Sequence, residues 1–278
     1  MPAIHQSFLP PGEDRAFVWK YSDSIGGRRP RHFHAEPELN LVVRGSATFG
    51  VGRKTISAAA GEVVAFPAAQ DHVLLSASPD LYLYAVGLDA RYSAHVLANE
   101  SVHPCHVRLA DHELGPVVSG VADIAESSHV AQPGAELWQR IHWLARRATP
   151  RSAPATHVLT RRTLHLLGEG SDLPLTRLAE MLRAQPAEVS RHFHHDMGIT
   201  LVRYRARLKL LHLIRLMDSR ESELMAAARR AGFGSYSQCH RTFQAELKCS
   251  PRDFFLAGVR SAMQGVYSDS CSSASGLE

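Results

Sequence analysis

Four side chains that could bind a metal ion lie in the first third of the chain: His32, His34, Glu38 and His72. His32 and His34 are two residues apart, so on a β-strand both side chains point to the same face. We expect Glu38 to return to that face and His72 to reach it from a later strand. Three imidazoles and a carboxylate suit Zn, Fe, Mn, Ni or Cu, and this donor set does not choose among those ions.

Short apolar runs separated by glycine-containing turns surround these residues, from about residue 16 to residue 88. Runs of this length with tight turns between them are typical of an all-β sandwich or barrel. The expected strands are Leu39–Val43, Ala47–Val51, Glu62–Phe66, His72–Ala77 and Leu81–Val86.

The spacing of glycine, histidine and glutamate in this region resembles the two motifs of the cupins, which are small β-barrels of the jelly-roll kind. The matching residues are Gly26, His32, His34, Glu38 and Gly45, then Gly61, Pro67 and His72. Ala69 and Ser76 depart from the second motif, which usually has Gly and Asn there. The resemblance implies that His32, His34, Glu38 and His72 bind one metal ion inside the barrel. The alternative is that they line a polar cavity or bind an organic effector.

From about residue 111 the apolar residues follow helical spacing. We expect helices at Leu114–Ser127 and Ala135–Arg147, the second with Leu137, Ile141 and Leu144 on one stripe. This stripe must be buried, and a second copy of the chain is a natural partner. Residues 111–148 are therefore predicted to be a helical dimerisation region, and the Pro-, Ala- and Ser-rich residues 149–156 a linker.

The rest of the chain to about residue 256 is predicted to be helical, with two helix-turn-helix units. The expected helices are Thr156–Leu167, Leu175–Leu182, Pro186–Met197, Leu201–Asp218, Glu221–Ala231, Ser235–Leu247 and Pro251–Leu256. In each unit the second helix carries an Arg two residues before a Phe, as in Arg191 and Phe193. Small residues such as Ala179 and Ala228 in the first helices allow the close crossing of a DNA-reading motif.

Residues 173–255 resemble the AraC/XylS family of bacterial transcription regulators. The resemblance is carried by Leu178-Ala179, Val189–Phe193, Gly198, Arg207-Leu208, Gly232-Phe233, Arg241–Phe243 and Ser250-Pro251. It implies a C-terminal domain that binds DNA and an N-terminal domain that senses an effector or dimerises. Arg183 and Lys248 stand where the family has turn glycines, and Gln185 where it has a capping Ser. Arg183 and Lys248 would therefore have to adopt a positive φ at some energetic cost, or the turn must differ from that of the family.

The predicted DNA contacts lie on the outward faces of the two recognition helices. They are Ala187, Ser190, Arg191 and His194 in the first helix, and Tyr236, Ser237, His240 and Arg241 in the second. The resemblance aligns Ala187, Ser190 and Arg191 with base-contacting positions, and an arginine there can bind guanine with two hydrogen bonds. The alternative for Arg191 and Arg241 is an ion pair within the domain. Arg203, Arg205, Arg229, Arg230 and Lys248 are predicted phosphate contacts.

The distribution of charged residues also differs between the N-terminal and C-terminal halves of the chain. Residues 1–150 contain 13 Lys and Arg against 15 Asp and Glu, whereas residues 151–260 contain 18 against 10. A basic C-terminal half favours a polyanionic partner there. No apolar run is long enough to span a membrane, no secretion signal is apparent, and the four cysteines form no CxxC pair, so we expect a cytoplasmic protein.

The sequence thus predicts a two-domain α+β protein. Its predicted parts are a cupin-like sensor domain (1–110), the dimerisation region (111–148), the linker (149–156), a tandem helix-turn-helix domain (157–260) and a disordered tail (261–278). The predicted function is a sequence-specific transcription regulator, not an enzyme, whose barrel binds a small-molecule effector or a divalent metal. Double-stranded DNA in two successive major grooves, a second copy of the chain and RNA polymerase are the expected partners. The alternative function is a metal-dependent cupin enzyme, such as a dioxygenase or isomerase, fused to a DNA-binding module. A third possibility is a constitutive DNA-binding protein whose barrel is only a dimerisation scaffold.

Overall fold

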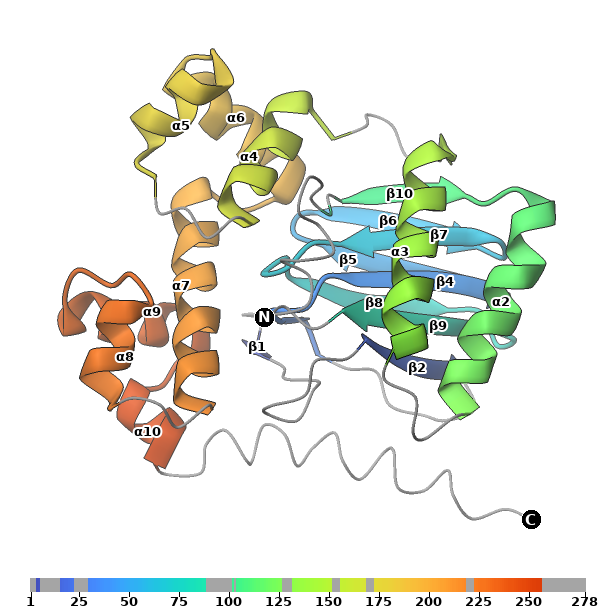
Figure 1. The fold of residues 1–278 in the computed structure, drawn as a ribbon, viewed down its shortest axis with the longest axis horizontal. Helices are drawn as coiled ribbons and strands as arrows, with labels where there is room; N and C mark the ends of the chain where they lie inside the picture. The colour runs from blue at the N-terminus through green and yellow to red at the C-terminus, as the bar shows by residue number, and fades with distance from the viewer. Residues whose placement is uncertain are drawn as a thin grey trace.

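The N-terminal domain consists of two β-sheets packed face to face (Figure 1). The computed structural model describes residues 4–5, 16–22, 30–88, 102, 104–126, 132–151, 156–168, 173–218 and 223–256. In spatial order, one sheet contains β1 (Ile4–His5), β3 (His32–Phe33), β8 (His72–Ala77), β5 (Ser46–Val51) and β6 (Lys54–Ala59). The other contains β11 (Thr149–Pro150), β10 (Cys105–Arg108), β7 (Glu62–Phe66), β4 (Glu38–Arg44), β9 (Tyr82–Leu88) and β2 (Ala16–Ser22).

Strand β4 separates two apolar layers because successive side chains point to opposite faces. Val42 packs between the sheets with Phe49 and Phe66. Leu39 and Leu41 pack on the outer face of the six-stranded sheet. Glu38 starts the same strand an even number of residues from Val42, which places it on the inner face of the barrel.

Helices α2 (Asp111–Glu126) and α3 (Gln132–Arg147) cover the outer face of the six-stranded sheet (Figure 1). Trp138, Ile141 and Leu144 of α3 are buried in one cluster with Leu39 and other residues of that sheet. The apolar stripe that suggested a second chain is therefore buried within the same chain, although the side chain of Leu137 lies outside the described residues. The homodimer remains a prediction, and the burial of this stripe no longer supports it.

The first residues of the predicted linker are attached to the barrel. Thr149 and Pro150 form β11, which pairs with β10, and Arg151 Nε lies 3.0 Å from the Glu62 carboxylate. Residues 152–155 lie outside the described part of the chain. The connection between the domains thus begins as a strand of the barrel rather than as a free linker.

The C-terminal domain is helical, with one helix-turn-helix unit at each end of a long central helix (Figure 1). Its helices are α4 (Val158–Gly168), α5 (Leu175–Leu182), α6 (Pro186–Met197), α7 (Leu201–Asp218), α8 (Leu224–Arg230), α9 (Tyr236–Leu247) and α10 (Pro251–Leu256). The predicted bounds of α5, α6, α7 and α10 are confirmed. Phe193 and Phe243 are fully buried, as expected for the core positions of the two units.

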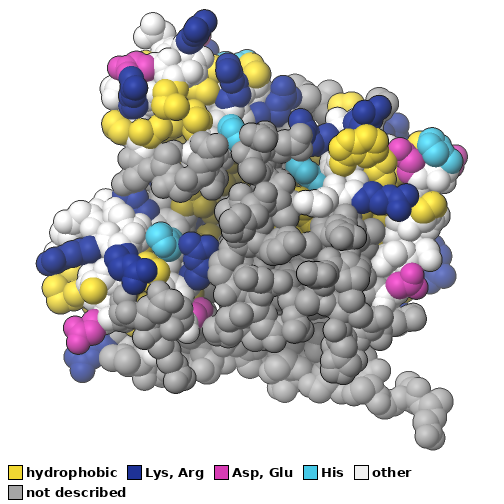
Figure 2. Space-filling model, in the orientation of Figure 1, with side chains coloured by type: hydrophobic (Ala, Val, Ile, Leu, Met, Phe, Trp, Pro, Cys, Tyr) yellow, Lys and Arg dark blue, Asp and Glu magenta, His cyan; other side chains and the backbone are white. Residues whose placement is uncertain are grey.

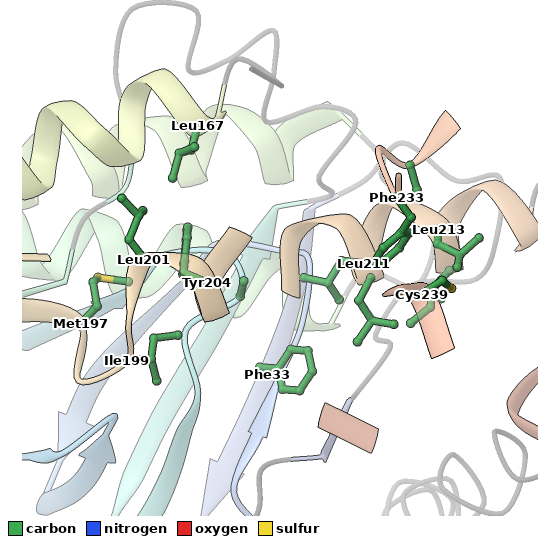
Figure 3. Close-up of a cluster of buried hydrophobic side chains, with 14 of the residues drawn as sticks. Phe33, Leu167, Met197, Ile199, Leu201, Tyr204, Leu211, Leu213, Phe233 and Cys239 are labelled. Carbon is green, nitrogen blue, oxygen red and sulfur yellow. The ribbon is translucent and has the colours of Figure 1, made fainter. Parts of the chain in front are cut away.

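The core of this domain includes residues of the barrel. Phe33 from β3 and Ala69 from the segment before β8 belong to the same buried cluster as Tyr204 and Leu211 of α7. Figure 3 shows Phe33 projecting toward the helices. The two domains therefore share one hydrophobic core.

Two predictions fall outside the described residues: the disordered tail at 261–278 and the cupin-motif glycine Gly26. Within the described residues, no helix has both the length and the apolar character needed to cross a lipid bilayer.

Candidate functional site

The fold brings the predicted metal-ligand residues together inside the barrel. His32 and His72 are directly paired across β3 and β8, and His34 follows His32 on the same face. Suitable ring nitrogens of the three histidines all lie within 4.8 Å of one another. Glu38 joins them from the other sheet, with its carboxylate oxygens 3.2 Å from His34 Nε2 and 3.9 Å from His72 Nε2.

Backbone carbonyls orient the three imidazoles. The Nδ1 atoms of His32, His34 and His72 lie 2.8, 2.7 and 3.1 Å from the carbonyl oxygens of Pro30, Glu36 and Gln70. A carbonyl oxygen only accepts hydrogen bonds, so each Nδ1 must carry the proton. In a neutral ring, Nε2 is then left with its lone pair, the arrangement found in metal-binding histidines.

Burial disfavours the charged forms of His32 and His72. It lowers the pKa of His72 to about 4, and together with the charges of His72 and His34 it lowers the pKa of His32 well below its usual value. Burial alone would raise the pKa of Glu38, but contacts with His34, His72 and Asn40 hold that pKa below its usual range. The site therefore disfavours a charge on His32 and His72 and holds a buried carboxylate beside them.

The donor set fits a divalent transition metal. His34 Nε2 and His72 Nε2 are only 3.4 Å apart, and both approach the Glu38 carboxylate. Acceptor atoms this close repel one another unless a proton or a cation lies between them. Imidazole nitrogens with one carboxylate suit Zn, Fe, Mn, Ni or Cu better than Mg or Ca, which prefer oxygen ligands.

The predicted DNA-contact residues of α6 lie on the surface. Ala187, Arg191 and His194 are exposed and Ser190 is half-buried, whereas Val189 and Phe193 on the opposite face are buried. The second unit repeats this arrangement, because Tyr236, Ser237, His240 and Arg241 are exposed and Cys239 is buried. Both recognition helices thus present the predicted faces to solvent.

Neither Arg191 nor Arg241 has a carboxylate partner among the described residues, so the ion-pair alternative receives no support. Lys and Arg side chains lie over both helix-turn-helix units on the face shown in Figure 2. Arg203, a predicted phosphate contact, instead pairs with Glu246 of α9 at 2.6 Å. Its guanidinium holds α7 and α9 together.

The positive φ angles predicted for Arg183 and Lys248 are confirmed. Arg183 has φ 52° and Lys248 has φ 61°, both in the left-handed region. Gln185 begins α6 without the usual Ser, and its backbone N–H donates instead to the Glu188 carboxylate at 3.1 Å. Arg183 lies in the turn between α5 and α6, whereas Lys248 lies at the end of α9, and each adopts this conformation at the cost of local backbone strain.

A cavity of about 590 Å³ lies between the barrel and the first helix-turn-helix unit. Lys54, Arg146 and Arg161 are among its lining residues, together with Asp196 and apolar side chains such as Ile56. Its volume is that of a small-molecule site. It is separate from the histidine cluster, since none of its lining residues belongs to that cluster.

Sequence reasoning did not assign a role to Arg207, which the structure shows to be almost completely buried between the domains. Its Nη1 lies 2.8 Å from Asp71 of the barrel and its Nε 2.8 Å from Glu246 of α9. One signal was present in the sequence. Arg207 follows Tyr204 by three residues and precedes Leu211 by four, which places a charged residue on the apolar stripe of α7.

Two family sequence models match the chain. The model of the AraC-like ligand-binding domain matches residues 20–142, and that of a helix-turn-helix domain matches residues 178–257. No curated protein sequence matches the chain.

Solved structures with a similar arrangement include two of ToxT from Vibrio cholerae and one of the AraC-like transcriptional activator CuxR. ToxT of strain O395 is 12% identical, with 88% of this chain and 98% of that chain covered and a TM-score of 0.45. Wild-type ToxT of strain SCE256 with a bound unsaturated fatty acid is 11% identical, with 88% and 95% covered and a TM-score of 0.44. CuxR is 13% identical, with 74% of each chain covered and a TM-score of 0.33.

The two family matches fall on the two domains that the structure shows, the barrel with its helices and the tandem helix-turn-helix domain. Together with the exposed recognition helices, they determine the class of the protein. The chain belongs to the AraC family of DNA-binding transcription regulators, with an AraC-like ligand-binding domain followed by a helix-turn-helix DNA-binding domain.

Proposed function

We propose that this regulator senses a divalent transition-metal ion through His32, His34, His72 and Glu38, and that occupancy of this site changes its affinity for DNA. The observation that carries the proposal is the cluster of three buried imidazoles, two of which, those of His34 and His72, have Nε2 close to the buried carboxylate of Glu38. Bound there, a metal ion would supply the positive charge that these acceptor atoms lack. The residues of the chain hold the imidazoles in one tautomer through three backbone carbonyls and exclude water from the site.

Burial favours sensing over catalysis at this site. His32, His34, Glu38 and His72 are each no more than 5% exposed. A catalytic metal keeps a coordination position open to substrate, whereas four enclosed protein donors favour a closed site. We therefore prefer the regulator to the alternative of a cupin dioxygenase or isomerase fused to a DNA-binding module.

The proposed regulator reads DNA with α6 and α9. Two recognition helices joined by α7 suit two successive major grooves on one face of the duplex, spaced by about 34 Å. We propose that it acts in the cytoplasm as a homodimer and contacts RNA polymerase. The exposed faces of α6 and α9 support the DNA part of this proposal.

The test is the metal content of the full-length protein purified without chelators, followed by titration with Co²⁺ as a spectroscopic probe. We expect one equivalent of bound metal in the wild type and none in the double variant His32→Ala/His72→Ala. The control is His142→Ala, which removes a buried imidazole of α3 outside the cluster. The His142→Ala variant should still bind one equivalent of metal.

A wild-type protein that contains no metal and shows no Co²⁺ spectrum would contradict the proposed metal site. Equal metal content in the wild type and the double variant would place the metal elsewhere. If turnover of a candidate substrate accompanied metal binding, the enzyme alternative would replace the sensor.

A further inference from the structure

The barrel segments that carry the histidines also carry the contacts to the DNA-binding domain. His32 of β3 and His34 just after it belong to the histidine cluster, and Phe33 between them is fully buried in the core of the helical domain. The guanidinium of Arg207 lies 4.5 Å from the centre of the Phe33 ring. Any movement of β3 that changes the positions of the histidines therefore moves a side chain in the core of the other domain.

The segment that precedes His72 makes a second set of contacts. The Tyr204 hydroxyl donates to the Ala68 carbonyl at 2.8 Å, and Arg207 Nη1 donates to the Ala69 carbonyl at 3.1 Å and to the Asp71 carboxylate at 2.8 Å. Because these acceptors lie one to four residues before His72, the path from imidazole to α7 is very short.

A backbone hydrogen bond ties these two barrel segments to each other. The amide of Ala69 donates to the carbonyl of His34 at 2.8 Å. Ala69 also adopts a left-handed conformation with φ 61°, which is unusual for alanine. The segment is thus held in one specific shape, with its carbonyls directed at α7. We call Tyr204 and Arg207, with Ala68, Ala69 and Asp71, the interdomain latch.

The latch continues into the second recognition helix. Arg207 Nε donates to Glu246 of α9 at 2.8 Å, and Asp71, Arg207 and Glu246 are all buried. Asp71 also pairs with Arg31 at 2.9 Å and Glu246 with Arg203 at 2.6 Å, so each charged group keeps a partner if Arg207 loses one carboxylate. The loss would still leave buried guanidinium N–H donors of Arg207 with fewer acceptors, which is unfavourable. If Asp71 moves, Arg207 either follows it and pulls on Glu246 of α9, or loses its hydrogen bond to Asp71. A movement of Asp71 that leaves Glu246 in place and keeps both hydrogen bonds is disfavoured.

We propose that Arg207 couples the state of the histidine pocket to the position of the recognition helix α9, so that the latch sets how DNA affinity responds to the pocket. This inference takes the pocket of the proposed function as the place where a ligand acts. The coupling itself depends only on the contacts of β3 and residues 68–72. A substitution in the pocket should therefore also change the affinity for DNA.

The experiment is a double-mutant cycle on DNA affinity in the full-length protein. The probe is a duplex selected from a random-sequence pool by the wild type. His34→Ala changes the pocket. Arg207→Lys keeps the positive charge of the latch but removes the guanidinium N–H groups that donate to Asp71 and Glu246 at the same time. We expect His34→Ala to change the dissociation constant at least fivefold in the wild type and less than twofold in the Arg207→Lys background, in the range of known coupling between sites.

Two further variants make the result decisive. Tyr204→Phe removes only the hydrogen bond to the Ala68 carbonyl and should also reduce the response, which keeps the test available if Arg207→Lys fails to fold by circular dichroism. Arg203→Lys is the matched control, because Arg203 also pairs with Glu246 but its side-chain hydrogen bonds within the described residues go to Glu246 and not to the barrel. In that background, His34→Ala should retain its full effect.

Equal responses in the wild type, Tyr204→Phe and Arg207→Lys would overturn the coupling, as would a wild type in which His34→Ala leaves DNA affinity unchanged. Failure of the metal proposal would look different. The protein would bind no Co²⁺, yet the cycle would still show the loss of response on breaking the latch.

Discussion

Arg191 and Arg241 occupy equivalent positions in α6 and α9, each exposed and two residues before a buried phenylalanine. An exposed arginine on a recognition helix can bind O6 and N7 of guanine together, and one such pair discriminates against a wrong base by about 1–3 kcal/mol. We expect Arg191→Ala and Arg241→Ala each to weaken binding to the selected duplex by that amount, with little change for a scrambled duplex. Fluorescence anisotropy on both duplexes measures this.

Arg177 provides the control for this prediction. It is exposed on α5 and pairs with Glu180 of the same helix at 2.8 Å, away from both recognition helices. Arg177→Ala should leave the ratio of the two affinities unchanged. If Arg191→Ala or Arg241→Ala instead lowers both affinities equally, that arginine contacts phosphate and does not read sequence.

At the scale of an element, the turn after α5 depends on an arginine in a conformation that favours glycine. Arg183 has φ 52°, where a residue with a Cβ is strained by about 1–2 kcal/mol. Glycine removes that strain but increases the entropy of the unfolded chain, which offsets part of the gain. We expect Arg183→Gly to raise the free energy of unfolding by about 0.5–1 kcal/mol, measured by urea denaturation.

The matched control is Arg162→Gly on the exposed face of α4, where the backbone is helical. There glycine only adds flexibility, so the free energy of unfolding should fall by about 1 kcal/mol. Two Arg→Gly changes of opposite sign would attribute the effect to the backbone angle. Loss of stability in Arg183→Gly would show that the arginine side chain matters more than its φ.

The helices were predictable to a greater extent than the strands. Helices α5, α6 and α7 combine apolar periodicity with clear ends such as Pro186, so their bounds could be read directly. Strand β6 (Lys54–Ala59) was missed because its alternation of half-buried and exposed residues uses small and polar side chains. Strand β11 was missed because a Pro- and Ala-rich segment resembles a linker, and only its pairing partner β10 makes it a strand.

For the candidate site, the sequence identified the four donors but not their connection to DNA binding. The spacing of His32 and His34 places both side chains on one face of a strand, and this follows from local geometry alone. The latch depends on contacts such as Tyr204 to Ala68, which are 136 residues apart. No local pattern encodes such a pair, so it became visible only in the folded chain.

At the scale of the whole molecule, the hairpin between β5 and β6 docks against the end of α6. A Cβ on Gly52 would lie 2.5 Å from the Met197 carbonyl oxygen, and Gly52 has a positive φ of 55°. Gly52→Ala must therefore push the barrel away from the first helix-turn-helix unit. We expect it to lower the free energy of unfolding by about 1–3 kcal/mol beyond the strain of the backbone angle alone, as overpacking does.

Gly61→Ala separates the cost of overpacking from the strain of the backbone angle. Gly61 also has a positive φ, of 82°, but a Cβ there would meet no atom closer than 3.4 Å. It should show only the backbone strain, about 1–2 kcal/mol, in the same denaturation experiment. Similar losses in the two variants would show that the hairpin yields easily and that the docking is loose.

The placement of Phe33 and Ala69 in the core of the helical domain has a consequence for how the protein is made. The ribosome synthesises the N-terminal half first, and domains generally fold in that order. The barrel is then already present as a surface on which α7 completes its packing. A chain translated only from a start site downstream of residue 69 would lack two residues of that core. We therefore expect a C-terminal fragment to be less stable than the same domain in the full-length chain, because the surface of α7 that Phe33 and Ala69 cover would be exposed to water.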